Sequence, residues 1–164
     1  MKSKQVALFG MLVALAFIFS YIEYLIPLPL PTGVKLGAAN IVILCALYFM
    51  GWKEALAISC VRIILSGFAV GISTVPYSLA GGLLSLLIMV WLKKGNRFGV
   101  TGVSVAGSVC HNIGQTLVAM LLLGNKTIYY FPLLLLSGII AGVLIGLISG
   151  IVLEKLKKHI RKGT

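Results

Sequence analysis

The stretch FPLLLLSGIIAGVLIGLISGIVLEKLKK, residues 131–158, decides the fold class of this chain. Its first charged residue is Glu154, and the uncharged, largely apolar run extends back through residues 128–153. A helix that crosses a membrane needs about 20 consecutive, predominantly apolar residues. The stretch therefore predicts a membrane-spanning helix that continues into a basic segment outside the membrane.

The composition of the whole chain supports the same class. The chain has 164 residues, of which 60% are hydrophobic and only 10% are charged, and its mean hydropathy is +1.11. Soluble domains carry about 25% charged residues. We therefore expect an all-α, polytopic protein with one membrane domain over residues 1–164. Six spans are predicted, at about 6–26, 36–50, 54–69, 75–92, 100–123 and 128–153.

The basic residues orient these six predicted spans. Eleven of the fourteen fall on one side, whereas Lys35 and Lys126 fall on the other and Arg62 lies inside a span. Cytoplasmic loops collect Lys and Arg, so both termini are predicted to face the cytoplasm of a bacterial plasma membrane. This bias and contact with anionic lipid explain the net charge of +11 better than nucleic-acid binding does.

Small residues recur at helical spacing in the first and last predicted spans. Small residues four positions apart let two helix backbones approach closely in lipid. The pattern predicts packing within the chain or docking of a partner, and it leaves these two alternatives open. The residues concerned are Gly138, Gly142, Gly146 and Gly150, with Gly10 and Ala14 as a shorter version.

Polar side chains at membrane depth form a second pattern. His111 and Gln115 belong to one polar stripe on the fifth span, and Asn112 lies about 100° around the helix from it. Arg62 lies about 12 Å into the third span, where an arginine is costly and by default functional. It is expected to bind an anion, or alternatively to pair with Glu23.

Three further polar residues are expected near the outer side. Lys35 precedes a predicted helix start, a position that favours anions, although it could simply anchor that helix. Asn40 is slightly deeper, and Tyr77 begins the fourth span as a site or aromatic-belt residue. Together these patterns predict an outward-facing pocket for an anionic or polar-headed molecule. Its predicted residues are Lys35, Asn40, Arg62, Tyr77, His111, Asn112 and Gln115.

The sequence argues against catalysis by this chain. It contains no aspartate, and its three glutamates, Glu23, Glu54 and Glu154, are far apart. Enzymes that act on diphosphates hold Mg²⁺ with clustered oxygen ligands. No nucleotide-binding or hydrolase motif is present either. We expect a protein that is not an enzyme and holds no cofactor and no metal.

Four motifs, taken in order, resemble a known family. GVKLGAANIV, SCVRIILSG, YSLAGGLLSLLIM and SVCHNIGQTLVA are similar to the Gx transporter family, also labelled heptaprenyl diphosphate synthase component I. That family looks related to the S components of energy-coupling factor (ECF) transporters. The resemblance implies six helices with both termini inside, and docking on an ECF coupling subunit through an AxxxA pattern, which reads Gly10-xxx-Ala14 here.

These observations give two functional hypotheses. The first is a membrane substrate-binding subunit that takes up a small anionic or polar organic molecule, energised by separate ATPases. The alternative is a non-catalytic membrane partner in isoprenoid or quinone metabolism, or in flavin-based extracellular electron transfer, to which the resembling family is linked.

Overall fold

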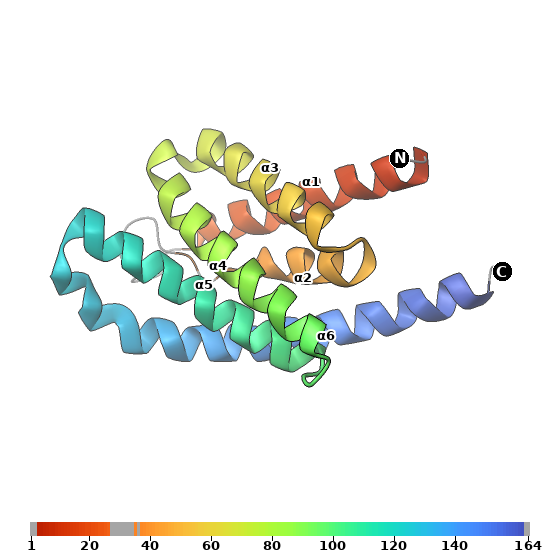
Figure 1. Ribbon diagram of the computed structural model, residues 1–164. Coiled ribbons are helices and arrows are strands. Elements are labelled where there is room, and N and C mark those ends of the chain that lie inside the picture. Colours follow the sequence, from red (N-terminus) through yellow and green to blue (C-terminus); the bar gives the residue numbers. More distant parts are fainter. Residues whose placement is uncertain (1–2, 27–34, 36, 163–164) are drawn as a thin grey trace.

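The computed structural model describes residues 3–26, 35 and 37–162, and their secondary structure is entirely helical (Figure 1). This confirms the all-α prediction for the described part of the chain. The predicted start of the second span at residue 36 lies outside these residues. The elements are α1 (Ser3–Leu25), α2 (Asn40–Phe49), α3 (Trp52–Val70), η1 (Ile72–Thr74), α4 (Val75–Gly95), α5 (Val100–Leu123), η2 (Asn125–Tyr130) and α6 (Phe131–Lys162).

Four segments are long and apolar enough to cross a membrane: Gln5–Leu25, Ile72–Gly95, Val100–Leu123 and Asn125–Lys155. These correspond to four of the six predicted spans. The segment predicted at residues 36–50 is shorter than expected, because α2 has only 10 residues and measures about 15 Å against a core of about 30 Å. Helix α3 has 19 residues but carries the charged Lys53, Glu54 and Arg62.

Helix α2 is bounded by glycines in conformations that other residues rarely adopt. Gly37, before the helix, has φ +87°, and Gly51, after it, has φ +120°. Glycine reaches positive φ without the steric penalty of a Cβ atom. The chain therefore turns sharply on both sides of α2, which explains why the helix begins later than its apolar pattern predicted.

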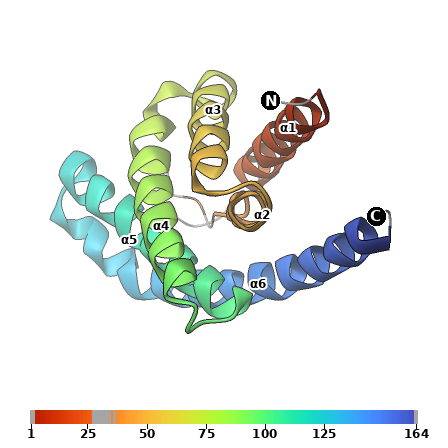
Figure 2. The same ribbon diagram turned by 45° about the vertical axis from the view of Figure 1, so that its right-hand side comes forward.

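Helix α2 lies in the middle of the bundle (Figure 2). It contacts each of the other five α-helices, and residues 42–47 are all buried. A helix that is apolar on every side is typical of a buried core element. Helices α1 and α6 flank it, and their backbones do not come close to each other in the described residues. The hydrophobic core is therefore centred on α2.

Two oppositely charged side chains hold the ends of α2. The carboxylate of Glu23 on α1 accepts hydrogen bonds from the N–H groups of Gly37 at 2.7 Å and Ala38 at 3.0 Å. At the other end, Lys93 Nζ on α4 donates to the carbonyl of Leu47 at 2.6 Å and lies 4.8 Å from the centre of the Tyr48 ring. A carboxylate at the N-terminal side and an ammonium at the C-terminal end both complement the helix dipole.

Helix α5 packs between α4 and α6. Its contact with α6 is made through the glycines spaced four residues apart on α6, which we call the glycine ladder. A Cβ atom built at Gly142 would lie 2.6 Å from Val105 Cα, and one at Gly146 would lie 2.6 Å from Thr101 Cα. At Gly138 it would lie 2.8 Å from Asn112 Nδ2. Three of the four predicted packing glycines therefore pack within the chain, whereas a Cβ atom at Gly150 would meet nothing within 4 Å.

The ladder gives a matched pair of variants. Gly142→Ala places a methyl group against the α5 backbone, and overpacking of this kind costs about 1–3 kcal/mol. Gly150→Ala adds the same methyl in open space and gains helix propensity of about 0.5–1 kcal/mol. We expect opposite shifts in the unfolding midpoint of the detergent-solubilised protein. Equal shifts would contradict the assignment of α6 to α5.

Candidate functional site

Arg62 projects from the middle of α3 into the bundle and is only 4% exposed. Its Nη1 donates to Ser20 Oγ on α1 at 2.9 Å, while Nε and Nη2 have no hydrogen-bond acceptor. On the α4 side, a Cβ atom at Gly82 would lie 3.7 Å from Arg62 Nη2. Burying a guanidinium with two unpaired nitrogens costs folding free energy. An acceptor atom from a bound molecule would offset that cost.

Glu23 does not neutralise this arginine by direct contact. Both carboxylate oxygens accept backbone N–H bonds at the start of α2, and no ion pair within 4 Å joins Glu23 to Arg62 among the described residues. The two groups are still close enough to attract each other electrostatically. The alternative of a simple Glu23–Arg62 pair is therefore wrong at the level of direct contact.

Lys35 is the second buried cation. Its backbone N–H donates to Gln115 Oε1 at 3.1 Å, and its Nζ is buried without a partner. Burial lowers the pKa of the ammonium, Arg62 lowers it further, and Glu23 opposes the shift. An anion beside Nζ would raise that pKa again, so anion binding and the charge on Lys35 would reinforce each other.

Gln115 connects Lys35 to His111. The Lys35 N–H can only donate, so the Gln115 atom that accepts it is Oε1. The side-chain nitrogen of Gln115, Nε2, then lies 3.0 Å from His111 Nε2. The Gln115 nitrogen must donate, which makes His111 Nε2 the acceptor and leaves the proton of a neutral imidazole on Nδ1. Nδ1 faces the Gly81 backbone without a well-aligned hydrogen bond. His111 is thus held in one tautomer.

Two glycines allow His111 to sit where it does. A Cβ atom at Gly37 would lie 3.0 Å from His111 Cδ2, and one at Gly81 would lie 2.9 Å from Nδ1. The same Cβ position at Gly37 is 3.0 Å from Asn40 Nδ2, which is buried and has no partner. His111 and Asn40 therefore meet at the turn before α2.

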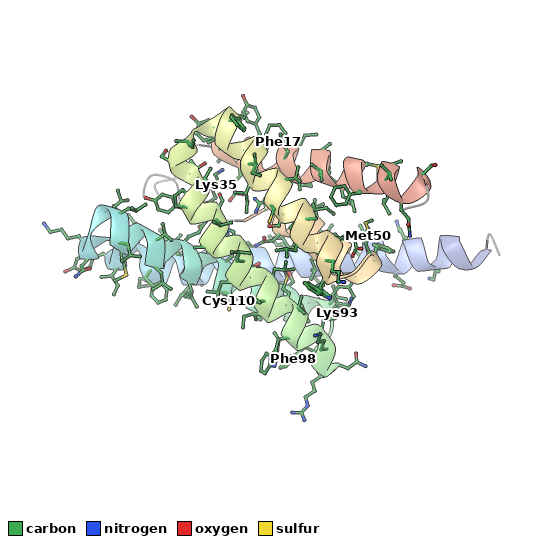
Figure 3. All side chains as sticks on the ribbon, turned by 45° about the horizontal axis from the view of Figure 1, so that its top comes forward. Phe17, Lys35, Met50, Lys93, Phe98 and Cys110 are labelled. Atoms are coloured by element: carbon green, nitrogen blue, oxygen red, sulfur yellow. The ribbon has the colours of Figure 1, made fainter. Side chains whose placement is uncertain are left out.

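These contacts define one polar cluster at the N-terminal side of α2. The cluster draws on α1, α3, α5, the turn before α2 and the first residue of α2, and Gly81 and Gly82 of α4 lie against it. In Figure 3, Lys35 lies toward the opposite end of α4 from Lys93. Its members are Ser20, Glu23, Lys35, Asn40, Arg62, His111 and Gln115.

Two predicted site residues lie elsewhere. Asn112 Nδ2 donates to the Leu134 carbonyl on α6 at 2.6 Å, and Tyr77 packs in a small core with Ala119 and Leu134. Asn112 therefore joins α5 to α6. The predicted outward-facing hollow stays a prediction, because residues 27–34 and 36, which adjoin Lys35 in sequence, lie outside the described part of the chain.

Ser20 was not among the predicted site residues. It is buried, with an exposure of 1%, and its Oγ on α1 accepts the hydrogen bond from Arg62 Nη1. A signal was available: Ser20 lies three residues before Glu23 and shares its helix face in an otherwise apolar segment. Polar residues that share a face at membrane depth usually turn toward protein.

The chain matches a known family over residues 12–152, most of its length. It belongs to the heptaprenyl diphosphate synthase component I family. A comparison with curated proteins and a comparison with solved structures each found no match.

The family description raises the question of where a component I protein could hold Mg²⁺–diphosphate. Glu23 is occupied by backbone N–H groups, and Glu154 pairs with Lys158 at 3.1 Å. Glu54 adjoins Phe9, near the start of α1, about 21 Å along that helix from Glu23. The described residues hold no group of three metal-ligating side chains. The three carboxylates of this chain do not converge.

The role of Glu23 in holding α2 can be measured. Glu23→Ala leaves two N–H groups without an acceptor and removes the nearest negative charge from two buried cations. We expect a loss of about 1–3 kcal/mol in the free energy of unfolding. Glu154→Ala, at an exposed ion pair, is the matched control and should cost less than about 1 kcal/mol. Denaturant titration in detergent measures both, and equal effects would contradict the capping role.

Proposed function

We propose that this component I protein is a non-catalytic, multi-pass protein of the bacterial plasma membrane that binds a small molecule through an anionic group. The observation that carries the proposal is the set of buried donors without acceptors at Lys35 Nζ, Asn40 Nδ2 and Arg62 Nε and Nη2. A protein interior pairs nearly all such groups. A carboxylate or phosphate oxygen would satisfy them and balance the excess positive charge.

The topology supports the same proposal. Four segments have the length of membrane spans, and we place α2 and α3 among them to give six helices with both termini in the cytoplasm. Short spans are tolerated where surrounding protein shields their ends, as Glu23 and Lys93 do for α2. Lys53 and Lys94 lie at helix ends, and Lys155 follows the apolar part of α6, all on the proposed cytoplasmic side.

Uptake is the function that we favour for this site. The cluster is built from four parts of the chain, which suits a site that encloses its ligand. The sequence carries no nucleotide-binding motif, so we assign the energy for transport to separate ATPases and a coupling subunit. Helix α1 offers a docking face, since Ala14 is exposed and a Cβ atom at Gly10 would meet nothing within 4 Å. Small residues of this kind suit close packing by a partner helix.

The family description favours a second candidate. A component of a synthase implies a partner that carries the catalytic carboxylates, since this chain has no aspartate and its three glutamates lie apart. In that role the protein would be a membrane partner in isoprenoid or quinone metabolism, or in flavin-based extracellular electron transfer. The same cationic cluster would then bind the anionic group of a shared metabolite.

Arg62 tests the binding site. Arg62→Ala should abolish retention of a co-purified small molecule in native mass spectrometry. The variant should still insert, because removing an arginine at depth relieves at least about 2.5 kcal/mol on insertion scales. Lys126→Ala, which removes an exposed cation outside the cluster, should leave retention unchanged. Full retention by the Arg62 variant would remove the cluster from ligand binding.

Co-purification separates the two candidates. Uptake predicts recovery of an ATPase pair with a membrane coupling subunit, whereas the synthase role predicts recovery of a soluble, aspartate-rich enzyme. Gly10→Leu should eliminate the ATPase complex without altering the unfolding midpoint, because the position is open within the chain. A normal yield of that complex from the Gly10 variant would show that α1 is not the docking face.

A further inference from the structure

A cavity of about 600 Å³ lies at the turn between α4 and α5, separate from the polar cluster. Two cationic side chains, Lys94 and Arg97, line it together with the aromatic Trp91 and Phe98 and the apolar Leu92. The cavity volume falls within the range of small-molecule sites. Its walls combine charges that attract phosphate with rings and methyl groups that suit hydrocarbon.

We propose that this cavity, which we name the α4–α5 turn site, binds an anionic phospholipid, with the phosphate on Lys94 and Arg97 and the upper acyl chain against Trp91 and Phe98. The proposal is independent of the function assigned to the polar cluster. Cations next to a membrane-spanning helix attract the headgroups of acidic lipids. Aromatic rings that sit at headgroup level anchor such segments in the membrane interface.

The cations of the turn are not committed elsewhere in the described structure. Neither Lys94 nor Arg97 forms an ion pair within 4 Å among the described residues. The preceding Lys93 differs, because its Nζ binds the Leu47 carbonyl and faces the Tyr48 ring. Of these two consecutive lysines, Lys93 therefore binds a carbonyl at the C-terminal end of α2, and Lys94 lines the cavity.

The turn geometry holds the two cations near each other. Helix α4 ends at Gly95, and Asn96 follows with φ +52°, the left-handed conformation that typically ends a helix. Arg97 comes immediately afterwards, before α5 begins at Val100. Trp91, which is 69% exposed, lies one turn before the end of α4. Trp91 therefore lies about one helical turn nearer the apolar part of α4 than Lys94 does, which is the order that an acyl chain and its headgroup would have.

The two tryptophans of the chain make the test direct. In a Trp52→Phe background, Trp91 is the sole tryptophan and reports on lipid at the site. The full chain is reconstituted in phosphatidylcholine vesicles that contain a low mole fraction of brominated phosphatidylglycerol or, separately, brominated phosphatidylcholine. We expect at least twofold stronger quenching of Trp91 by the anionic lipid.

Two double variants distinguish a specific lipid site from non-specific attraction of acidic lipid to the basic surface. Lys94→Gln with Arg97→Gln should reduce quenching by phosphatidylglycerol to the phosphatidylcholine level. Lys53→Gln with Lys155→Gln removes the same charge from outside the cavity and should leave the preference intact. Equal quenching by the two lipids would overturn the proposal in favour of another occupant, such as an acidic partner protein. An equal loss in both double variants would overturn it in favour of non-specific surface attraction.

Discussion

The structure depends on the neutralisation of the two ends of α2. Glu23 accepts the N–H groups before this short helix, and Lys93 donates to the carbonyl of Leu47 near its end. In water, such groups would be hydrated, but a helix buried inside a membrane bundle has no water to use. Helices α1 and α4 must therefore bring a carboxylate and an ammonium to fixed positions. Because α2 contacts every other α-helix, fixing α2 also fixes the relative places of its neighbours.

The same arrangement explains why the polar cluster is cationic. Each oxygen of Glu23 already accepts a backbone N–H, so the carboxylate contacts neither Arg62 nor the ammonium of Lys35 within ion-pair distance. A buried cation without a direct partner is destabilising, and folding alone would favour an apolar residue at either position. The fold therefore uses the carboxylate of Glu23 to cap α2 and leaves buried donors of Lys35 and Arg62 without an acceptor. Under the proposed function, an anionic ligand would pair with these donors and balance their charge.

Features that depend on hydrophobic periodicity and segment length, such as the helix ranges, could be predicted from the sequence. Features that depend on contacts between helices, such as the hydrogen-bond partners of buried polar residues, could not. Four of the six α-helices lie within three residues of their predicted ranges, and His111 and Gln115 lie 3.0 Å apart in the same buried cluster. Asn112, about 100° around the same helix, turned instead to α6. Helix α2 begins later than predicted because the backbone of Gly37 turns at positive φ. Glu23 binds two backbone N–H groups rather than the Arg62 guanidinium because α2 packs with its N-terminal side next to Glu23. Neither has a local sequence signal.

Helix α4 links packing to the geometry of the site. Gly81 contacts His111 of α5, and Gly82 contacts Arg62 and Ser59 of α3, so two consecutive residues face two different helices. Because neither glycine has a side chain, only the backbone of α4 separates His111 from Arg62 at this level. The separation between the imidazole and the guanidinium is then set by backbone contact, which is stiffer than a choice of rotamers. Under the proposed function, a site fixed in this way would lose little conformational entropy when a ligand binds, and it would select ligands by the size of the group that fits between these helices.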